Sequence, residues 1–104
     1  MTADEFRTLA LAQPEAEERG HQGHPDFRVR GKVFATLGYP NDEWAMVKLA
    51  PDEQLALVAA EPNAFVPVKG KWGERGATNV RLALADPGDV RKALASACAR
   101  IPRA

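Results

Sequence analysis

The sequence has a single cysteine and no long hydrophobic run, and these absences exclude several classes of protein. Cys98 has no second cysteine to pair with, so the chain forms neither an internal disulfide nor a cysteine-based zinc site. No apolar run approaches the roughly 18 residues that a membrane span needs. The first ten residues carry acids where a signal peptide carries bases and a long apolar core. We therefore expect a cytoplasmic protein without membrane contact, in which Cys98 is a small core residue.

The chain also has no net charge, which argues against a surface built wholly to hold nucleic acid or anionic lipid. The charges are nevertheless unevenly distributed. Residues 1–62 contain 11 acidic and 6 basic side chains, net −5, whereas residues 63–104 contain 3 acidic and 8 basic ones, net +5. A negatively charged partner would therefore meet the C-terminal part of the chain first.

The size and composition are those of one ordinary globular domain. The chain has 104 residues, of which 45% are hydrophobic and 27% charged, enough to close one hydrophobic core but not two. No internal repeat, linker or low-complexity tract interrupts it. We therefore expect residues 1–104 to form a single domain.

Capping residues and apolar spacing predict three helices. The first, over residues 2–13, opens with a capping box and ends before a proline. The second, over residues 51–61, has proline at its first position and two acids in its first turn. The third, over residues 86–101, opens with an aspartate cap and carries one apolar stripe.

Alternating apolar residues predict the strands. We expect a short edge strand near residues 16–19, a β-hairpin over 27–37, and strands over 44–49, 65–68 and 78–85. The order α-β-β-β-β-α-β-β-α predicts an α+β fold with an antiparallel sheet covered by helices in two layers. Alternation places Ala45, Val47 and Leu49 on one face and Trp44, Met46 and Lys48 on the other, with Val80, Leu82 and Leu84 inward and Arg81 outward.

Two histidines three positions apart are the best candidate for a metal site. His21 and His24 precede Asp26, and Glu17 and Glu18 lie upstream. Imidazole and carboxylate suit divalent transition metals, but no third ligand has a fixed spacing and no helix holds the two rings in place. We therefore predict no physiological metal here, and we assign His24 and Asp26 to the entry of the hairpin.

No recognisable catalytic set is present. The grouped acids Glu15, Glu17 and Glu18 lack the distinct environments that separate the pKa values of a catalytic pair. Cys98 is predicted in the middle of a helix, away from a helix N-terminus that would favour a thiolate. The glycines of GKWGERG precede a strand rather than a helix, so they do not form a phosphate-binding loop. We therefore predict a protein that is not an enzyme and needs no cofactor.

The segment around Trp72 is the one place that departs from an ordinary surface. Trp72 lies between two glycines, in a segment that also carries Lys69, Lys71, Glu74 and Arg75. The glycines favour a mobile turn or loop. Because cations attract phosphates and an aromatic ring stacks on bases, such a turn would act as a nucleic-acid-binding wing. In the alternative interpretation, Trp72 folds onto the sheet and closes the core, and the lysines are merely solvated.

A second basic row follows the predicted hairpin. Arg28, Arg30 and Lys32 have the same parity along the chain, so we expect at least the first two to point to one face. An exposed strand is, however, often basic simply to keep the protein soluble. The row therefore has both a binding and a solubility interpretation.

Three segments, in the same order, resemble the MmcQ/YjbR family of small bacterial proteins: GHPDFRVRGKVFATL, VKLAPDEQ and PVKGKWGERGATNVRLA. The resemblance covers nearly the whole chain. It implies a compact two-layer α/β fold and a DNA-binding role through a double wing, and the family offers no established active site. The implied wings are the hairpin around Gly31 with Arg28, Arg30 and Lys32, and the turn around Trp72 with Lys69, Lys71, Arg75 and Arg81.

The sequence thus leads to two functional hypotheses. The first is a non-enzymatic binding module that contacts DNA or another nucleic acid weakly, through two basic hairpin wings and in a salt-dependent manner. The second is an adaptor for a protein or small ligand, which uses the Trp72 turn or the sheet face and in which a buried aromatic anchor carries the binding energy.

Overall fold

The computed structural model describes residues 1–21 and 24–103, without the side chain of His21. It has the predicted α+β fold and the predicted order of elements, with one additional short helix. In chain order the elements are α1 (Ala3–Leu11), β1 (Ala16–His21), β2 (His24–Val29), β3 (Lys32–Leu37), β4 (Trp44–Lys48), α2 (Pro51–Ala60), β5 (Phe65–Pro67), α3 (Lys71–Glu74), β6 (Ala77–Arg81) and α4 (Pro87–Ala99).

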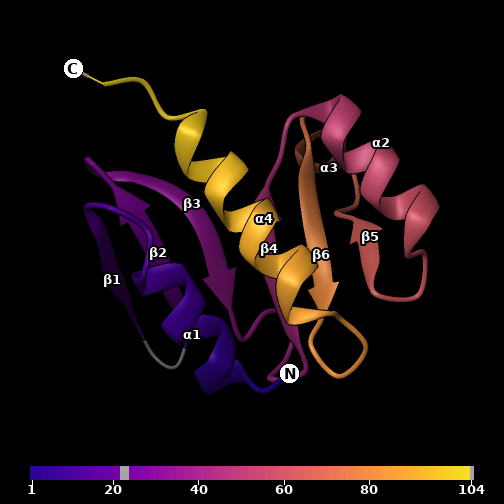
Figure 1. The fold of residues 1–104 in the computed structure, drawn as a ribbon, viewed down its shortest axis with the longest axis horizontal. Coiled ribbons are helices and arrows are strands. Elements are labelled where there is room, and N and C mark those ends of the chain that lie inside the picture. The colour runs from indigo at the N-terminus through magenta and orange to yellow at the C-terminus, as the bar shows by residue number, and fades with distance from the viewer. Residues whose placement is uncertain (22–23, 104) are drawn as a thin grey trace.

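The strands form one antiparallel sheet with the order β1-β2-β3-β4-β6-β5. The first four strands follow one another as a meander, as predicted, and β6 then inserts between β4 and β5. In Figure 1, α1 and α4 lie across the front of this sheet, while α3 lies behind β6. Helix α2 packs against β5 at one edge. The sheet therefore has one covered face and one largely open face.

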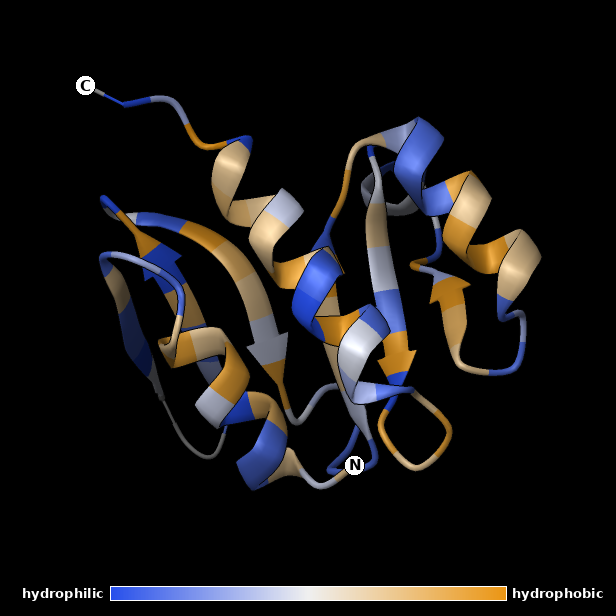
Figure 2. Ribbon diagram, in the orientation of Figure 1, coloured by the Kyte–Doolittle hydropathy of each residue, from blue (hydrophilic) through white to orange (hydrophobic). Residues whose placement is uncertain are grey.

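The helix boundaries follow from the capping residues. At the start of α1, the hydroxyl of Thr2 accepts a hydrogen bond of 3.1 Å from the Glu5 backbone amide, and the Glu5 carboxylate accepts one of 2.8 Å from the Thr2 amide. At α4, the carboxylate of Asp86 accepts a hydrogen bond from the Asp89 amide. Helix α2 begins with a proline and hydrophilic residues and continues with hydrophobic ones, as Figure 2 shows. These local interactions confirm the three predicted helices.

The hydrophobic core lies between the covered face of the sheet and helices α1 and α4. It is built around four buried phenylalanines, and the ring centroids of Phe6 and Phe27 are 6.2 Å apart. From β4 the core receives Ala45 and Val47, as the alternation predicts, while the other side chains of that strand point to the open face. Among the described residues, no helix is long and apolar enough to cross a membrane.

Three details differ from the sequence prediction. Strand β2 starts at His24, so His24 and Asp26 belong to a strand instead of the loop before it. Strand β6 ends at Arg81, and the hydrogen bond from the Leu84 amide to the Arg81 carbonyl closes a turn. The side chain of Leu84 is consequently 55% exposed and not inward-facing. Helix α3 replaces the mobile loop that we expected around Trp72.

Candidate functional site

The open face of the sheet is a surface built from the side chains of neighbouring strands. Strand register aligns one row of side chains across it, because antiparallel partners lie side by side on the same face. From β2 to β5 this row consists of Asp26, Thr36, Met46, Asn79 and Val66. On β1, Arg19 is the partner of Asp26 and extends the row to the remaining strand, so this face is continuous across the sheet.

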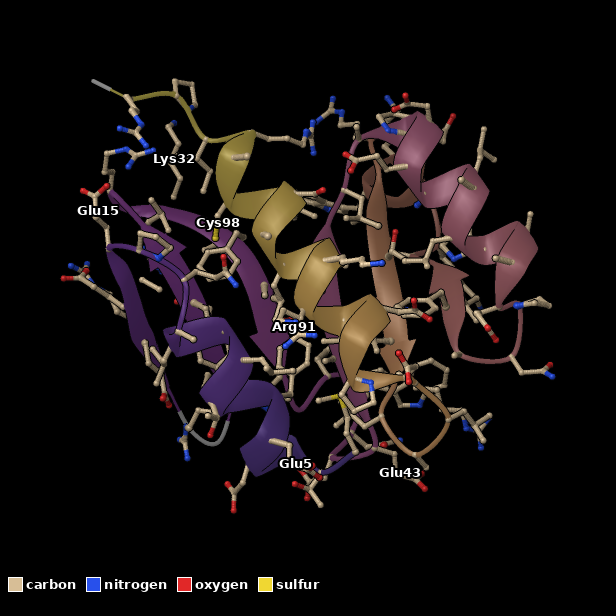
Figure 3. The ribbon with its side chains drawn as sticks, in the orientation of Figure 1. Glu5, Glu15, Lys32, Glu43, Arg91 and Cys98 are labelled. Atoms are coloured by element: carbon tan, nitrogen blue, oxygen red, sulfur yellow. The ribbon has the colours of Figure 1, made fainter. Side chains whose placement is uncertain are left out.

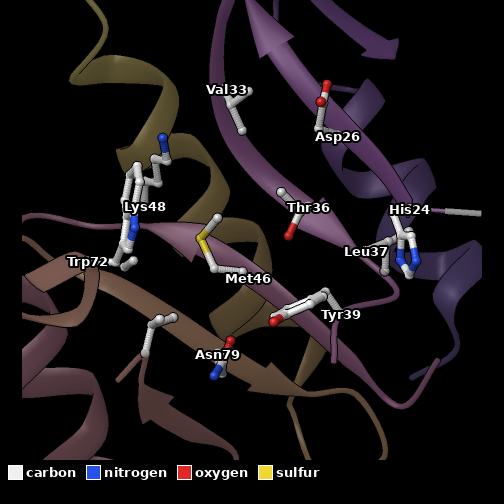
Figure 4. A pocket seen from close by; sticks show the side chains of 12 residues that line it. His24, Asp26, Val33, Thr36, Leu37, Tyr39, Met46, Lys48, Trp72 and Asn79 are labelled. Atoms are coloured by element: carbon white, nitrogen blue, oxygen red, sulfur yellow. The ribbon is translucent and has the colours of Figure 1, made fainter. Parts of the chain in front are cut away.

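A groove of about 400 Å³ lies on this open face. Its floor is formed by Thr36, Met46 and Asn79, on β3, β4 and β6. Tyr39 and Trp72 line it as well, and most of the remaining lining is aliphatic. Figure 4 shows Tyr39 near the middle of the groove and Trp72 at one end. A mostly apolar groove with a few polar groups is the usual form of a ligand site.

Trp72 lies on the open face and does not close the core. Its side chain is 61% exposed, and the ammonium group of Lys48 lies 5.2 Å from the centroid of its ring. Figure 4 shows the two side chains next to each other. The structure therefore decides between the two interpretations of Trp72 in favour of an exposed ring.

Close packing and buried hydrogen bonds hold α3 in place. The amide nitrogen of Gln54, a residue that is only 5% exposed, donates to the backbone carbonyls of Gly73 and Ala77, at 3.0 and 2.9 Å. A Cβ atom on Gly73 would lie 1.6 Å from the carbonyl oxygen of Val68, which leaves space only for glycine. The expected mobile turn is therefore wrong: this glycine serves a close approach of two backbone segments.

Tyr39 is a site residue that the sequence analysis did not select. Its side chain is 70% exposed and borders the groove. The ring of His24 lies edge-on to it, with the centroids 6.5 Å apart. A large aromatic residue inside a polar turn was the available signal, since a turn by itself has no need of a ring. Asn41, by contrast, does serve the turn, because its side-chain oxygen accepts a hydrogen bond from the Glu43 amide.

Of the first predicted wing, Arg28 lies on the open face but already has a partner. Its guanidinium donates two hydrogen bonds to the Asp26 carboxylate, at 2.9 and 3.1 Å. These hydrogen bonds raise the pKa of Arg28 above its ordinary value. A phosphate would have to compete with Asp26 for this side chain.

Arg30 points to the opposite side of the sheet. It lies in the hairpin turn with φ of +51°, so the alternation of the strand ends before it. Its guanidinium donates to the carbonyls of Ile101 and Pro102, at 3.0 and 3.1 Å, and to the Glu15 carboxylate at 2.8 Å. The expectation that Arg28 and Arg30 share one face is therefore wrong. Figure 3 shows exposed Lys32 and Glu15 near the end of the sheet from which the C-terminal segment leaves.

The second predicted wing keeps its charges available. Lys69, Lys71 and Arg75 are exposed on and beside α3, and Arg81 is exposed with its guanidinium 5.6 Å from the Trp44 ring centroid. Within residues 1–21 and 24–103, none of these four cations forms a salt bridge. The structure thus keeps Lys69, Lys71 and Arg75 on and beside the helix that carries Trp72. Arg81 lies at the other end of β6, next to Trp44, and Arg30 lies outside both groups.

Comparison with known proteins identifies the family. The model of the YjbR family matches residues 11–97. The chain belongs to the YjbR family. The crystal structure of the Deinococcus radiodurans protein DR2400, with a DUF419 domain, has a TM-score of 0.75 and 17% identity to the chain, and the match covers 93% of this chain and 75% of that one. At this identity the likeness shows the fold alone. No curated protein matches the chain.

The other candidate groups of this YjbR-family protein have structural contacts. Each grouped acid pairs with a different arginine: Glu15 with Arg30, Glu17 with Arg19 and Glu18 with Arg7. His24 Nδ1 lies 3.2 Å from the Gly38 carbonyl oxygen, while the side chain of His21 lies outside the described part. No three His, Cys, Asp or Glu side chains in the described chain gather in a way that could hold a metal ion. Partial burial raises the pKa of the Cys98 thiol to about 11.

Proposed function

We propose that this YjbR-family protein is a cytoplasmic, non-enzymatic binding module that contacts nucleic acid through the open face of its sheet. The observation that carries the proposal is the exposed Trp72 ring at the end of the groove, with the Lys48 ammonium 5.2 Å away. An exposed ring offers a stacking surface to a base, and a cation beside it offers a contact to the neighbouring phosphate.

The phosphate contacts are assigned to the cations around Trp72 and to Arg81. Lys69, Lys71 and Arg75 are exposed on the same short segment, and Arg81 lies on the open face of β6. Such contacts are independent of base sequence and weaken as salt increases, because binding releases counterions from the nucleic acid. The proposal therefore gives the second wing the main role. Arg28 and Arg30 contribute less because both already bind partners within the protein.

The apolar lining of the groove favours a second candidate function. Val33, Leu37 and Val68 line it together with Met46, and a surface of this kind also suits an apolar side chain of a protein partner or a small ligand. An adaptor would rely on contacts within the groove, and its affinity would depend little on Lys69 and Lys71. The salt dependence and the lysines therefore distinguish the two functions.

The test is a titration of labelled single-stranded and double-stranded oligonucleotides, followed by fluorescence anisotropy at low and moderate salt. The test variant is Lys69→Ala with Lys71→Ala. The matched control is Arg91→Ala with Lys92→Ala, which removes the same charge from exposed positions on α4, across the sheet. We expect the test variant alone to weaken binding and to lower the salt slope by about 0.7 for each phosphate that is no longer neutralised.

Two results would count against this proposal. Equal weakening by the test and control variants would mean that nucleic acid responds to net charge and not to the open face. Absence of saturable binding at tens of micromolar protein, a range of weak non-specific affinity, would favour the adaptor function.

A further inference from the structure

The floor of the groove carries two polar side chains that the protein does not use for its own structure. Thr36 and Asn79 are each partly exposed, on β3 and β6, and both line the groove. In the described structure, neither side chain has a hydrogen bond to another protein group. Figure 4 shows both of them beside Met46 and Tyr39. A hydroxyl and an amide in this position are free to bond to a ligand.

The surrounding side chains favour a flat ligand. Met46 lies between the two polar residues in the cross-sheet row, and its thioether makes favourable contacts with aromatic rings. The exposed rings of Tyr39 and Trp72 rise beside this floor. The volume of about 400 Å³ lies within the range of small-molecule sites, roughly 300 to 1,000 Å³. The groove thus combines planar apolar surfaces with hydrogen-bonding groups at their edge.

The charged side chains at the groove indicate the chemical class of the ligand. Lys48 lines the groove at Trp72, and the exposed Lys69 and Lys71 extend the positive charge beyond it. The carboxylate that lines the groove, that of Asp26, accepts two hydrogen bonds from Arg28. A nucleotide has these features, because its flat ring has hydrogen-bonding edges and is attached to negative charge, whereas an apolar peptide side chain has neither.

We propose that the groove binds one unpaired base of a single-stranded nucleic acid. The base lies against Met46 and an aromatic ring, with its edge toward Asn79 and Thr36. The flanking phosphates lie near Lys48, Lys69 and Lys71. The amide of Asn79 offers a donor and an acceptor side by side, which matches the edge of a base. This inference rests on the proposed function and adds the chemical group that the site recognises.

The proposal requires the base to leave a duplex. In a double helix, each base is stacked between its neighbours and its pairing edge is bonded to the partner base. Neither the faces nor the pairing edge of the base can therefore contact the floor of the groove. Single strands should therefore bind more tightly than duplexes of the same sequence. A strand without bases should lose the groove contacts and keep the phosphate contacts.

The experiment compares three labelled probes of equal length by fluorescence anisotropy at low salt: a mixed-sequence single strand, a strand made entirely of abasic sites, and the duplex. The groove variant is Thr36→Val with Asn79→Ala, and the charge variant is Lys69→Ala with Lys71→Ala. Thermal unfolding followed by circular dichroism verifies that both variants are folded. We expect the unmodified protein to bind the single strand at least about tenfold more tightly than the abasic strand, the usual scale for one stacked base.

The variants separate this inference from the proposed function. The groove variant should keep its affinity for the abasic strand and lose part of its preference for the single strand, because it removes the contacts to the edge of the base and leaves the stacking surfaces. The charge variant should weaken binding to both strands. Equal affinity for single and abasic strands, or tighter binding to the duplex, overturns the base site while nucleic acid binding stands. Absence of binding to all three probes overturns both.

A second measurement reports on the groove itself. The chain contains two tryptophans, so Trp44→Phe leaves Trp72 as the only source of tryptophan fluorescence. Titration with nucleoside monophosphates should quench this fluorescence in a saturable manner, because the base stacks near the ring. Ribose 5-phosphate, which has the charge without the base, should leave it unchanged. Equal quenching by both compounds, or by neither, would contradict the base site.

Discussion

The ammonium group of Lys48 lies 5.2 Å from the centroid of the Trp72 ring, although β4 and α3 are separate elements of the chain. This contact, worth about 0.5 to 1 kcal/mol at an exposed site, joins the only groove-lining lysine of the described residues to one of the two exposed aromatic rings of the groove. It places a cation where the sheet face meets the short helix. Substitutions can test what holds α3 in place and whether Trp72 contributes to binding.

Replacing Trp72 by alanine should weaken binding to single-stranded nucleic acid with little effect on folding. The ring is 61% exposed, so its removal should change the free energy of unfolding by less than about 0.5 kcal/mol. Loss of a stacking surface should cost about 1 to 3 kcal/mol of binding free energy. Trp72→Phe keeps an aromatic face and should retain most of the affinity. Anisotropy and urea unfolding measure the two effects, and equal loss of affinity in both variants would argue against stacking.

Gln54→Leu should destabilise the protein and weaken binding together. The side-chain amide of Gln54 is the buried donor to the carbonyls of Gly73 and Ala77, and leucine would leave both carbonyls without that donor. Each carbonyl keeps a backbone donor, the Gly76 amide for Gly73 and the Val68 amide for Ala77, so the expected cost is that of the two lost hydrogen bonds, about 0.5 to 1.5 kcal/mol each. Because α3 carries Trp72, its displacement should also lower affinity. Leu55→Ala, at the exposed neighbouring position, is the control and should do neither; urea unfolding and anisotropy give the comparison.

Gly73→Ala should cost more stability than Gly70→Ala. A Cβ on Gly73 would lie 1.6 Å from the Val68 carbonyl oxygen, so two backbone segments would have to separate, at about 3 kcal/mol or more. A Cβ on Gly70 meets nothing within 4 Å, and only its backbone conformation, with φ of +76° and ψ of −155°, is unfavourable, at about 1 to 3 kcal/mol. Chemical denaturation of both variants measures the difference. The reverse order would contradict the close packing of α3 against the Val68 backbone.

Arg30→Ala should lower stability without affecting nucleic acid binding appreciably. The guanidinium holds the carbonyls of Ile101 and Pro102 on the side of the sheet away from the groove. Loss of these hydrogen bonds should cost about 1 kcal/mol of unfolding free energy. We expect the oligonucleotide affinity to stay within about twofold, or ~0.4 kcal/mol. A larger loss of affinity, measured by anisotropy, would indicate that Arg30 contacts the nucleic acid as the first wing predicts.

Cys98 should react slowly with alkylating reagents in the folded protein. Partial burial raises the pKa of its thiol to about 11 from an ordinary value of 9.0, against a small opposing effect of Arg30. At pH 8 only about one thiol in a thousand is then ionised, and the thiolate is the reactive form. Iodoacetamide labelling followed by mass spectrometry should be much faster in urea. Equal rates in the two states would show that burial does not protect this thiol.

The same shift has a consequence for stability at high pH. The folded state favours the protonated thiol, so this contribution to stability is complete below pH 9 and is lost as the pH rises from 9 through 11. Unfolding of the unmodified protein and of Cys98→Ala, measured over this range, should show a decline that is smaller in the variant. An identical decline in both would assign the pH dependence to other groups.

Some features of the site could be predicted from the local sequence. Alternation in β4 correctly placed Lys48 and Met46 on the face opposite Ala45 and Val47. This worked because the side chains of a strand alternate regardless of what lies beside it. Trp72 was also identified as a candidate site residue, since a large ring among glycines and basic side chains is unusual in a turn. Tyr39 was missed because nothing near it in the chain indicates that β3 and β6 will build a floor beside it.

The failure at Arg30 has a definite physical origin. Parity predicts a shared face with Arg28 only while the strand continues, and the turn at Arg30, with φ of +51°, ends that alternation. The partners that then hold its side chain come from the C-terminal segment, which no local pattern connects with the hairpin.

By itself, the sequence determined most of the secondary structure, the antiparallel α+β class and the resemblance to the YjbR family, because capping bonds, proline positions and apolar periodicity act over a few neighbouring residues. Only the tertiary structure decided that Trp72 is exposed, that Arg30 turns away, and that Thr36, Met46 and Asn79 form one floor. These outcomes depend on strand register and on contacts such as that of Gln54 with α3, which join distant parts of the chain and arise only when the sheet is assembled.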